Sequence, residues 1–214
     1  VKDNQIIDKH CYSNDGYAFN ASGKGAVPIG QAIQTPHVFY NYNTSNTHDW
    51  CNPAGTVSGK STFFNLWSTN NTSSTGGGSV VKTIYDPSPV GYCLPTPTAV
   101  KGFSYNGGNA SGNYFGSKFN SPYTSEADFQ KNHGWVFYCY RMKAVGSYDL
   151  TGGVLFYPAL GCRFSSTGLP YGVQEYCYYW SCVSYGTRYA KSSLEATVNY
   201  QRALGFPIRP VREN

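Results

Sequence analysis

The C-terminal stretch GVQEYCYYWSCVSYGTRYAKSSLEATVNYQRALGFPIRPVREN (172–214) decides the fold of this chain. It opens with an aromatic cluster at 176–180 and closes with the compact run at 205–211. Aromatic and β-branched runs favour buried strands, so we interpret both ends as framework. The middle, 183–204, is polar and rich in turn-forming residues. We therefore expect a surface segment held between two framework segments.

The composition of the remaining chain indicates many loops and short strands. Only 13% of the 214 residues are charged and 17% are aromatic, with 24 Gly among them. An average protein has about 25% charged residues and more helix formers. These features predict an α+β fold, with short helices around small antiparallel sheets and long irregular loops.

The low-complexity run STNNTSSTGGGS at 68–79 is typical of a flexible linker. We take it as the boundary between an N-terminal elaboration (1–79) and a main domain (80–214). Within these parts we expect strands at 37–42, 82–85, 135–142 and 154–158. Short helices are expected at 98–103, with Thr96 as N-cap and Pro97 in the first turn, and at 125–130.

Charge and hydropathy exclude several classes of function. The net charge of +5 is spread along the chain, and its one local concentration of three basic residues is Arg202, Arg209 and Arg212. A nucleic-acid-binding protein would show a denser basic stripe, so we predict no such partner. No segment reaches the roughly 18 apolar residues that a membrane span needs. No signal peptide is visible, and the start at Val1 indicates a mature chain or an expressed fragment.

The sequence offers weak candidates for catalysis or metal binding. Seven cysteines cannot all pair with one another, and no CxxC motif is present. Cys177 and Cys182 either staple a turn or are buried thiols. His48 and Asp49 stand near Cys51, but residues so close in sequence seldom point into one site. The acidic residues of the last third are isolated, so we predict no calcium site, no cofactor and no enzyme activity.

Four segments in order resemble those of a known family. DPSPVGYCLPTPTAVKGF (86–103) resembles DPCPxGWRVPTxxEWxxF, and VLFYPALGCR (154–163) resembles LFLPAAGYR. YCYYWSC (176–182) resembles GYYWSS, and RALGFPIRPVRE (202–213) resembles RAxGFSVRCVRD. These patterns belong to Bacteroidetes surface proteins of the major-paralogous-domain and fimbrillin-tip kind. Ser88 stands where that pattern has Cys, and Cys93 where it has Arg.

The resemblance implies a C-type lectin-like fold, in which the N- and C-terminal strands pair and a long loop region is displayed. Similar domains occur as variable proteins of diversity-generating retroelements, in phage receptor-binding proteins and in bacterial adhesins. Their variable positions lie just upstream of the last framework strand. We therefore expect an extracellular protein of a bacterial surface or virion that recognises a protein or glycan receptor.

The segment 183–204 carries the expected binding face. Its Tyr, Ser, Gly and Asn match the mixture in antibody paratopes, where Tyr gives rigid contact area and small polar residues adapt their hydrogen bonds. If 189–199 is one strand, alternation places Tyr189, Lys191, Ser193, Glu195, Thr197 and Asn199 on one face. An ordinary hairpin with a solvated polar face would also show alternation. The predicted ligand-binding residues are Tyr185, Arg188, Tyr189, Lys191, Ser193, Glu195, Thr197, Asn199, Tyr200, Gln201 and Leu204.

A second hypothesis comes from another class of protein. The chain would be a structural or adhesive tip subunit of a bacterial pilus, or a surface lipoprotein. In that case the N-terminal third would mediate assembly.

Overall fold

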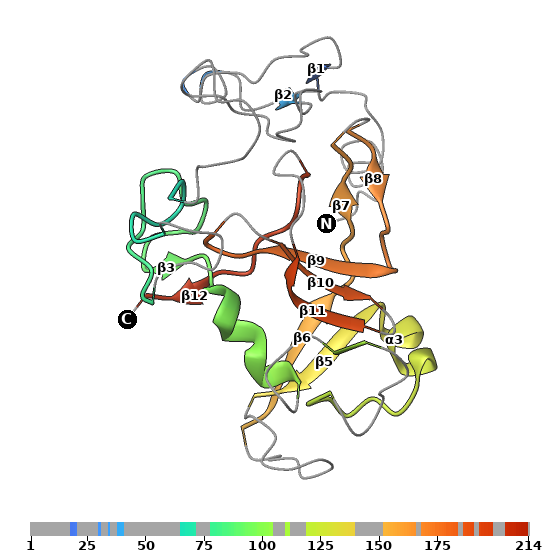
Figure 1. Cartoon of the computed structure of the whole chain (residues 1–214). Coiled ribbons are helices and arrows are strands. Elements are labelled where there is room, and N and C mark those ends of the chain that lie inside the picture. The colour runs from blue at the N-terminus through green and yellow to red at the C-terminus, as the bar shows by residue number, and fades with distance from the viewer. Residues whose placement is uncertain are drawn as a thin grey trace. The chain divides into compact units, whose positions relative to one another are not determined.

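The structure is a computed structural model of the chain (Figure 1). The residues described are 18–20, 30, 34, 38–40, 65–71, 78–104, 110–111, 119–139, 152–165, 168–183, 186–190, 193–198 and 204–213. For 18–20, 38, 110–111, 186–190 and 193–198 the description covers the backbone alone.

The described residues form two short helices and several small sheets, which confirms the α+β class. The helices are η2 (Pro97–Phe103), of the 3-10 type, and α3 (Glu126–Asn132). The strands are β1 (Ala18–Asn20), β2 (Val38–Tyr40), β3 (Tyr92–Cys93), β4 (Ala110–Ser111), β5 (Gly134–Tyr138), β6 (Val154–Pro158), β7 (Cys162–Arg163), β8 (Pro170–Tyr171), β9 (Tyr176–Trp180), β10 (Gly186–Ala190), β11 (Ser193–Val198) and β12 (Val211–Arg212).

The chain divides into two compact units. The first comprises Val1–Thr62, Cys162–Tyr171 and Tyr200–Gly205, and the second comprises Phe63–Gly161, Gly172–Asn199 and Phe206–Asn214. Residues 65–71 and 78–79 thus group with the second unit, although the linker-like composition placed them in the N-terminal part. The predicted domains 1–79 and 80–214, as independently folding parts, stay a prediction.

Within its described residues, the second unit contains three sheets. The largest has the order β4-β11-β10-β9, and all its neighbouring strands are antiparallel. Strands β5 and β6 form an antiparallel pair, and β3 pairs with β12 near the C-terminal end of the chain. Figure 1 shows β9, β10 and β11 as adjacent orange and red arrows, with the C-terminus beside β12. The last strand therefore closes on a strand from the beginning of this unit.

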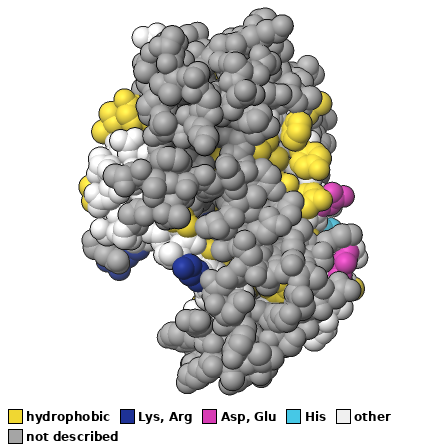
Figure 2. Space-filling view, viewed as in Figure 1, with side chains coloured by type: hydrophobic (Ala, Val, Ile, Leu, Met, Phe, Trp, Pro, Cys, Tyr) yellow, Lys and Arg dark blue, Asp and Glu magenta, His cyan; other side chains and the backbone are white. Residues whose placement is uncertain are grey.

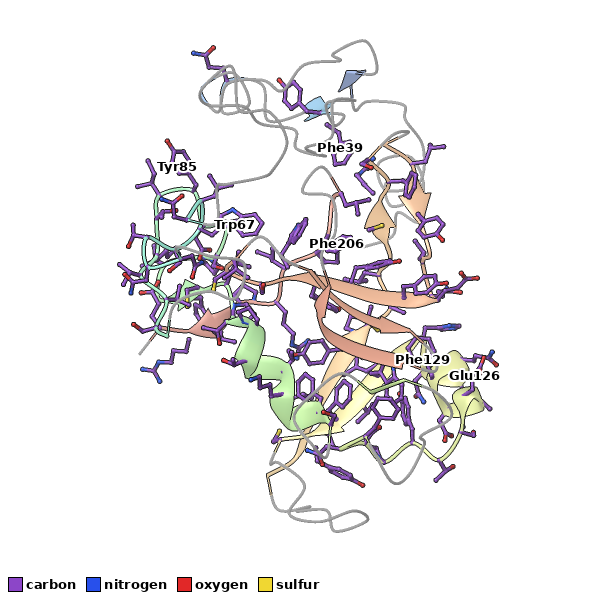
Figure 3. All side chains as sticks on the ribbon, in the orientation of Figure 1. Phe39, Trp67, Tyr85, Glu126, Phe129 and Phe206 are labelled. Atoms are coloured by element: carbon purple, nitrogen blue, oxygen red, sulfur yellow. The ribbon has the colours of Figure 1, made fainter. Side chains whose placement is uncertain are left out.

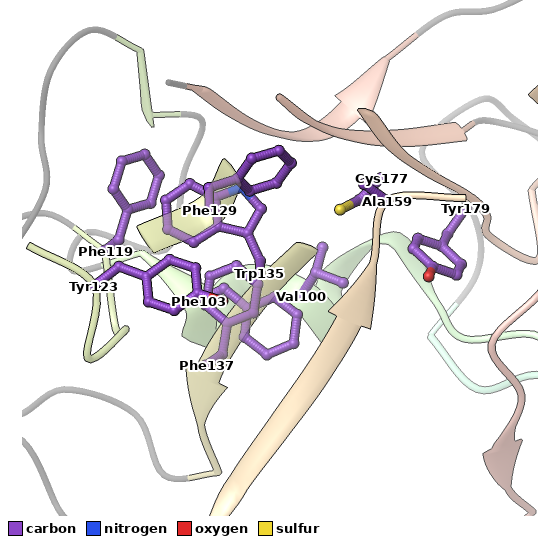
Figure 4. Packing of buried hydrophobic residues seen from close by; sticks show 10 residues of the cluster. All are labelled: Val100, Phe103, Phe119, Tyr123, Phe129, Trp135, Phe137, Ala159, Cys177 and Tyr179. Carbon is purple, nitrogen blue, oxygen red and sulfur yellow. The ribbon is translucent and has the colours of Figure 1, made fainter. Parts of the chain in front are cut away.

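Aromatic rings form the core of the second unit (Figure 4). Trp135 on β5 is fully buried, and its ring contacts those of Phe119, Tyr123, Phe129 and Phe137 at centroid distances of 5.0–5.8 Å. Aromatic pairs in this range contribute about 0.5–1.5 kcal/mol each beyond the area that they bury. The strand predicted at 135–142 is therefore confirmed for 135–138, which lie in β5 at the centre of the core. Cys139 is a bend beyond the strand, and 140–142 lie outside the described residues.

Helix η2 follows from its spacing of apolar residues. Pro97, Val100 and Phe103 are buried and stand three residues apart. Side chains at i and i+3 eclipse in a 3-10 helix, so this spacing places all three on one side. Pro97 occupies the first turn, as predicted, since that position needs no backbone donor. Thr96 is the N-cap residue, but its side chain makes no capping hydrogen bond.

Helix α3 is defined by caps at both ends. One carboxylate oxygen of Asp128 accepts hydrogen bonds from the amides of Thr124 and Ser125 at 2.8 and 3.1 Å. At the other end His133 adopts a left-handed conformation with φ of 50°, which ends the helix. Gly134 follows because a Cβ there would collide with the Tyr157 carbonyl oxygen. The helical turn predicted at 125–130 is thus confirmed and leads directly into β5.

The first unit pairs segments that are distant in sequence. Strands β1 and β2 are parallel, and β7 pairs with β8 in an antiparallel manner. Arg163 and Gly205 exchange two backbone hydrogen bonds of 3.0 and 2.9 Å. A Cβ at Gly205 would lie 2.9 Å from both the Arg163 Cβ and the Phe39 ring, so glycine permits this close approach.

The strand predicted at 82–85 is wrong. Lys82 forms only an isolated bridge with Ser68, and a turn follows at 84–85. The Lys82 ammonium instead donates to the carbonyl oxygens of Ser88, Pro89 and Tyr92 at 2.6–2.9 Å. These bonds hold the next turn, whose two prolines cannot donate to a strand ladder. The strand predicted at 154–158 is confirmed as β6. The strand predicted at 37–42 is confirmed for 38–40 as β2, while 37 and 41–42 lie outside the described residues.

Candidate functional site

Strand β9 is a framework strand that is buried on both faces. Cys177 and Tyr179 belong to the aromatic core, and the Tyr179 hydroxyl donates to the Pro158 carbonyl oxygen at 2.8 Å. Tyr178 and Trp180 point to the other face and lie against Phe206 at 4.7 and 4.5 Å between ring centroids. A strand covered on both sides reads as a continuous apolar run, which explains the YCYYW sequence.

The C-terminal run fixes the chain where it returns to β9. The amide of Trp180 donates to the Pro207 carbonyl oxygen at 3.1 Å. Phe206 and Trp67, labelled in Figure 3, both contact the Trp180 ring, and the Trp67 centroid lies 5.6 Å away. The framework segments on both sides of 183–204 are therefore joined to each other.

Arg209 adds contacts that hold the C-terminal run against the rest of the second unit. Its guanidinium lies 4.2 Å from the ring centroid of Tyr157 and donates to the Phe156 carbonyl oxygen at 2.6 Å. Burial raises the pKa of the Tyr157 hydroxyl, and the nearby Arg209 charge acts in the opposite direction. Sequence analysis missed this contact because 53 residues separate the two partners.

The segment predicted as one strand at 189–199 is instead a hairpin. Strand β10 pairs with β11 in the register Arg188↔Glu195, Tyr189↔Leu194 and Ala190↔Ser193. The chain reverses between 190 and 193, so residues before and after the turn cannot follow one alternation. Periodicity alone does not reveal such a reversal.

The register also changes the predicted binding face. Residues directly opposite in a sheet share a face. Tyr189 is therefore on the face of Leu194 and of the buried core residue Cys177, its partner on β9. Arg188, Ser193 and Glu195 lie on the opposite face. The expectation that Tyr189 shares a face with Ser193 and Glu195 is thus wrong, and Arg188 takes that place.

The predicted site residues divide into three groups. The described backbone places Arg188 and Tyr189 on β10, and Ser193, Glu195 and Thr197 on β11. Leu204 is 8% exposed, so its side chain is part of the interior and does not present a contact surface. The remaining predicted residues lie outside the described part of the chain: Tyr185, Lys191, Asn199, Tyr200 and Gln201.

The described cysteines are free thiols, so the predicted alternative of a Cys177–Cys182 staple is not present. The Cys177 thiol donates to the Tyr157 carbonyl oxygen at 3.2 Å and behaves as a core residue. Burial raises the pKa of Cys177 and of Cys162 to about 12. Burial therefore opposes the thiolate form that nucleophilic catalysis requires. His48, Asp49 and Cys51 lie outside the described residues.

Two further properties concern only the described part of the chain. It contains no group of three His, Cys, Asp or Glu side chains that could hold a metal ion. None of its helices has the length and apolar character needed to cross a membrane.

An apolar turn was missed by sequence analysis. Large apolar side chains lie exposed on the molecular surface, where Figure 2 shows yellow areas. In the second unit Ile84 and Val90 are 90% and 98% exposed, and they flank the turn that Lys82 holds. The DPSPVGY run could have indicated this exposure. Its prolines and glycine predict a turn, and apolar residues in a turn are not buried by strand pairing.

Comparison with known proteins gives no match: no family model, no curated protein and no solved structure is similar to this chain.

Proposed function

We propose that this chain is a non-enzymatic recognition protein with a C-type lectin-like fold, which binds a protein or glycan receptor through the β10–β11 hairpin. The observation that carries the proposal is that the two framework segments on either side of the hairpin, 176–180 and 205–211, contact each other. The Trp180–Pro207 hydrogen bond and the Phe206 ring join the two framework segments at that point. Binding residues are commonly carried by segments that a rigid scaffold holds in position.

Strand pairing supports the proposed fold. In a C-type lectin-like domain the N- and C-terminal strands pair. Here β3, near the beginning of the second unit, pairs with β12 at its end, with Cys93 opposite Val211. The four ordered sequence segments that resemble the family span the same part of the chain.

The proposed contact face is the one that carries Arg188, Ser193 and Glu195. On β9 this face carries Tyr178, which Phe206 covers, and the opposite face carries Cys177, which belongs to the core. Arg188 and Glu195 are direct cross-strand partners, so the face offers both signs of charge and hydroxyl groups. Such a surface suits polar receptors, because charged and hydroxyl groups provide directional hydrogen bonds.

The proposal extends to the origin and place of the protein. We propose a retroelement-diversified variable protein that is displayed on a bacterial surface or a virion. The coding DNA tests diversification: a nearby near-repeat that differs only at adenine positions, beside a reverse transcriptase gene, is expected. Absence of both would remove diversification while leaving the binding proposal in place.

Alanine substitution on both faces of the hairpin tests the binding proposal. The purified chain is first screened on arrays of surface glycans and displayed surface proteins. Arg188→Ala and Glu195→Ala are expected to weaken binding to the selected ligand by about 10-fold or more each, because a few central residues carry most of the binding energy of an interface. Titration of immobilised ligand gives the dissociation constants.

Matched controls separate contact from general charge. Lys101→Ala and Glu175→Ala remove the same charges from exposed positions outside the hairpin, and they are expected to bind within about 2-fold of the parent chain. Equal affinity of the hairpin variants and the controls would contradict the proposed binding face. The alternative of a pilus-tip or lipoprotein subunit depends on the N-terminal third and stays a prediction.

A further inference from the structure

Two consecutive β-turns in the second unit carry apolar side chains at their corners. In each turn, 83–86 and 89–92, the amide of the last residue donates to the carbonyl oxygen of the first, at 3.2 and 3.0 Å. Ile84 and Val90 are therefore the second residues of the two turns. They are 90% and 98% exposed, more than any other large apolar residue in the described part of the chain. Both side chains thus protrude from the surface.

The fold does not need apolar residues at these corners. A side chain this exposed buries almost no area, so it adds almost nothing to the hydrophobic stabilisation of the fold. Turn residues in proteins are mostly Gly, Pro, Asn, Asp and Ser. Four neighbouring apolar side chains are also exposed, by about half: Val81, Tyr85, Tyr92 and Val211. Together with the two corners they form a surface that we call the turn patch. Apolar surface gathered in this way marks contact with a protein or a membrane.

The two turns are held side by side. Lys82 precedes the first turn, and its ammonium donates to the carbonyl oxygens of Pro89 and Tyr92, the two ends of the second turn, at 2.9 and 2.8 Å. The Asp86 carboxylate, at the end of the first turn, accepts the amide of Ser88 at 2.8 Å. The corners are therefore fixed before any partner binds, which reduces the entropy that binding costs.

Charges around the turn patch favour a negatively charged partner. Asp86 is the only acidic residue in 81–93, and it is buried. Glu213 lies 3.8 Å from the Lys82 ammonium, so its charge is compensated. Arg212 belongs to β12, which pairs with β3 beside the second turn. It is exposed and has no ion pair among the described residues. The surface therefore combines apolar corners with an uncompensated positive charge.

We propose that the turn patch attaches this protein to the surface of a lipid bilayer that contains anionic headgroups. Ile84 and Val90 enter the boundary between the headgroups and the acyl chains, where burial of their side chains drives attachment. Tyr85 and Tyr92 lie at the level of the headgroups, where tyrosine is enriched in membrane proteins. Arg212 contacts the lipid phosphates.

A bilayer suits this surface better than a folded protein partner does. Protruding side chains need matching hollows on a folded partner, whereas fluid lipid receives them without any. Backbone groups that enter an apolar medium must already be bonded. The amides of Tyr85, Asp86 and Tyr92 donate within the turns. The Gly91 carbonyl oxygen accepts the amide of Glu213 at 3.0 Å. Attachment through so few side chains is reversible, and it does not depend on the ligand of the β10–β11 hairpin.

Co-sedimentation with vesicles tests the proposal on the full chain. One set of vesicles consists of phosphatidylcholine, and the other is a mixture of phosphatidylcholine and phosphatidylglycerol. The chain is expected to sediment with the mixed vesicles and more weakly with phosphatidylcholine alone, because only the mixture carries anionic headgroups. Arg212→Gln is expected to reduce this difference. Absence of sedimentation with the mixed vesicles, or equal sedimentation with both, would overturn the proposal.

Serine variants test whether the turn patch makes the contact. The double variant Ile84→Ser, Val90→Ser is expected to bind the mixed vesicles about 10-fold more weakly or less, because two apolar side chains no longer leave water. Its melting temperature should stay within about 2 °C of the parent, since both side chains are exposed. Val154→Ser, Leu160→Ser removes exposed apolar side chains elsewhere in the second unit, and it should bind within about 2-fold of the parent. Equal losses in the two double variants would overturn the assignment to the turn patch.

Self-association is the competing explanation for an exposed apolar surface. Sedimentation velocity without lipid is expected to give the same mass for the parent and for Ile84→Ser, Val90→Ser. A dimer of the parent that this variant abolishes would mean that a second copy covers the turn patch, and it would overturn the lipid proposal. The hairpin variants Arg188→Ala and Glu195→Ala are expected to bind the mixed vesicles as the parent does, which separates vesicle binding from receptor binding.

Discussion

Arg209 illustrates how a single side chain can be misjudged from its neighbours in sequence. It belongs to a group of three arginines near the C-terminal end, with Arg202 and Arg212. In the structure its guanidinium lies over the Tyr157 ring and bonds to the Phe156 carbonyl oxygen, so it serves packing. Arg212 is exposed on β12, and Arg202 lies outside the described residues. The basic cluster therefore contains a structural arginine.

Asp128 is expected to make the stability of the folded chain decrease as the pH falls into the acidic range. Hydrogen bonds from the amides of Thr124 and Ser125 lower the pKa of this carboxyl below its ordinary value of 3.8. A lowered folded-state pKa adds stability that is present above the ordinary value and lost as pH falls through the folded value. Asp128→Asn is expected to destabilise the protein at neutral pH and to make its loss of stability below about pH 4 shallower.

Urea unfolding at several pH values measures this effect. Lys131→Gln changes a charge on the same helix, but lysine does not titrate at acidic pH, so the slope should stay that of the parent chain. An unchanged slope in Asp128→Asn would show that the capping bonds do not persist in solution.

Individual core residues were largely predictable, whereas surface positions were not. Trp135 and Trp180 stand in aromatic runs that the sequence predicts as strand or framework, and both are buried. Leu204 was expected to contact a ligand, yet it is buried. Apolar character predicts burial well. Leu204 was nevertheless assigned to the binding segment, because the residues that precede it are polar.

At the scale of elements, the sequence predicted the short helices correctly but did not predict how the strands pair. Helix α3 was predictable because its caps lie within a few residues of one another, and η2 because Pro97 marks its first turn. The β10–β11 hairpin was read as one strand, because alternation continues through 189–199 without Gly or Pro at the reversal. Strand register depends on partners that are distant in sequence, and these become known only from the fold.

The hairpin register predicts opposite outcomes for neighbouring residues. Leu194 lies on the face of the core residue Cys177, and Glu195 lies on the other face, opposite Arg188. Leu194→Lys is expected to cost about 2 kcal/mol or more, because a charge at a core-facing position loses its hydration. Glu195→Lys is expected to change stability by about 0.5 kcal/mol or less.

Chemical denaturation of the two variants provides the measurement. Both introduce lysine at adjacent positions of β11, so the strand propensity of the new side chain is common to the two variants. The reverse order of stabilities would mean that the hairpin turns its other face to the core.

At the scale of the molecule, the two compact units are discontinuous in sequence. The first contains 162–171 and 200–205 in addition to its N-terminal residues, so contacts between distant segments define it. Composition could indicate the linker-like run at 68–79, but it could not show that the chain beside this run belongs to the second unit. Residues 65–71 group there because Trp67 packs on Trp180 and Asn71 bonds to the Cys182 carbonyl oxygen.

Two fragments test where the second unit begins. Fragment 63–214 keeps the Trp67 ring, the Asn71 hydrogen bond and the backbone bond from Thr69 to Val81 at 3.0 Å, and fragment 80–214 loses all three. Removal of a half-buried Trp and a buried hydrogen bond is expected to make fragment 80–214 less stable by about 3 kcal/mol. The near-ultraviolet circular dichroism of Trp135 and its neighbours reports folding of the core in both fragments, and urea titration gives the difference. Equal stability of the two fragments would place the boundary at residue 79, where the composition changes, and would show that the contacts of Trp67 and Asn71 do not support the framework.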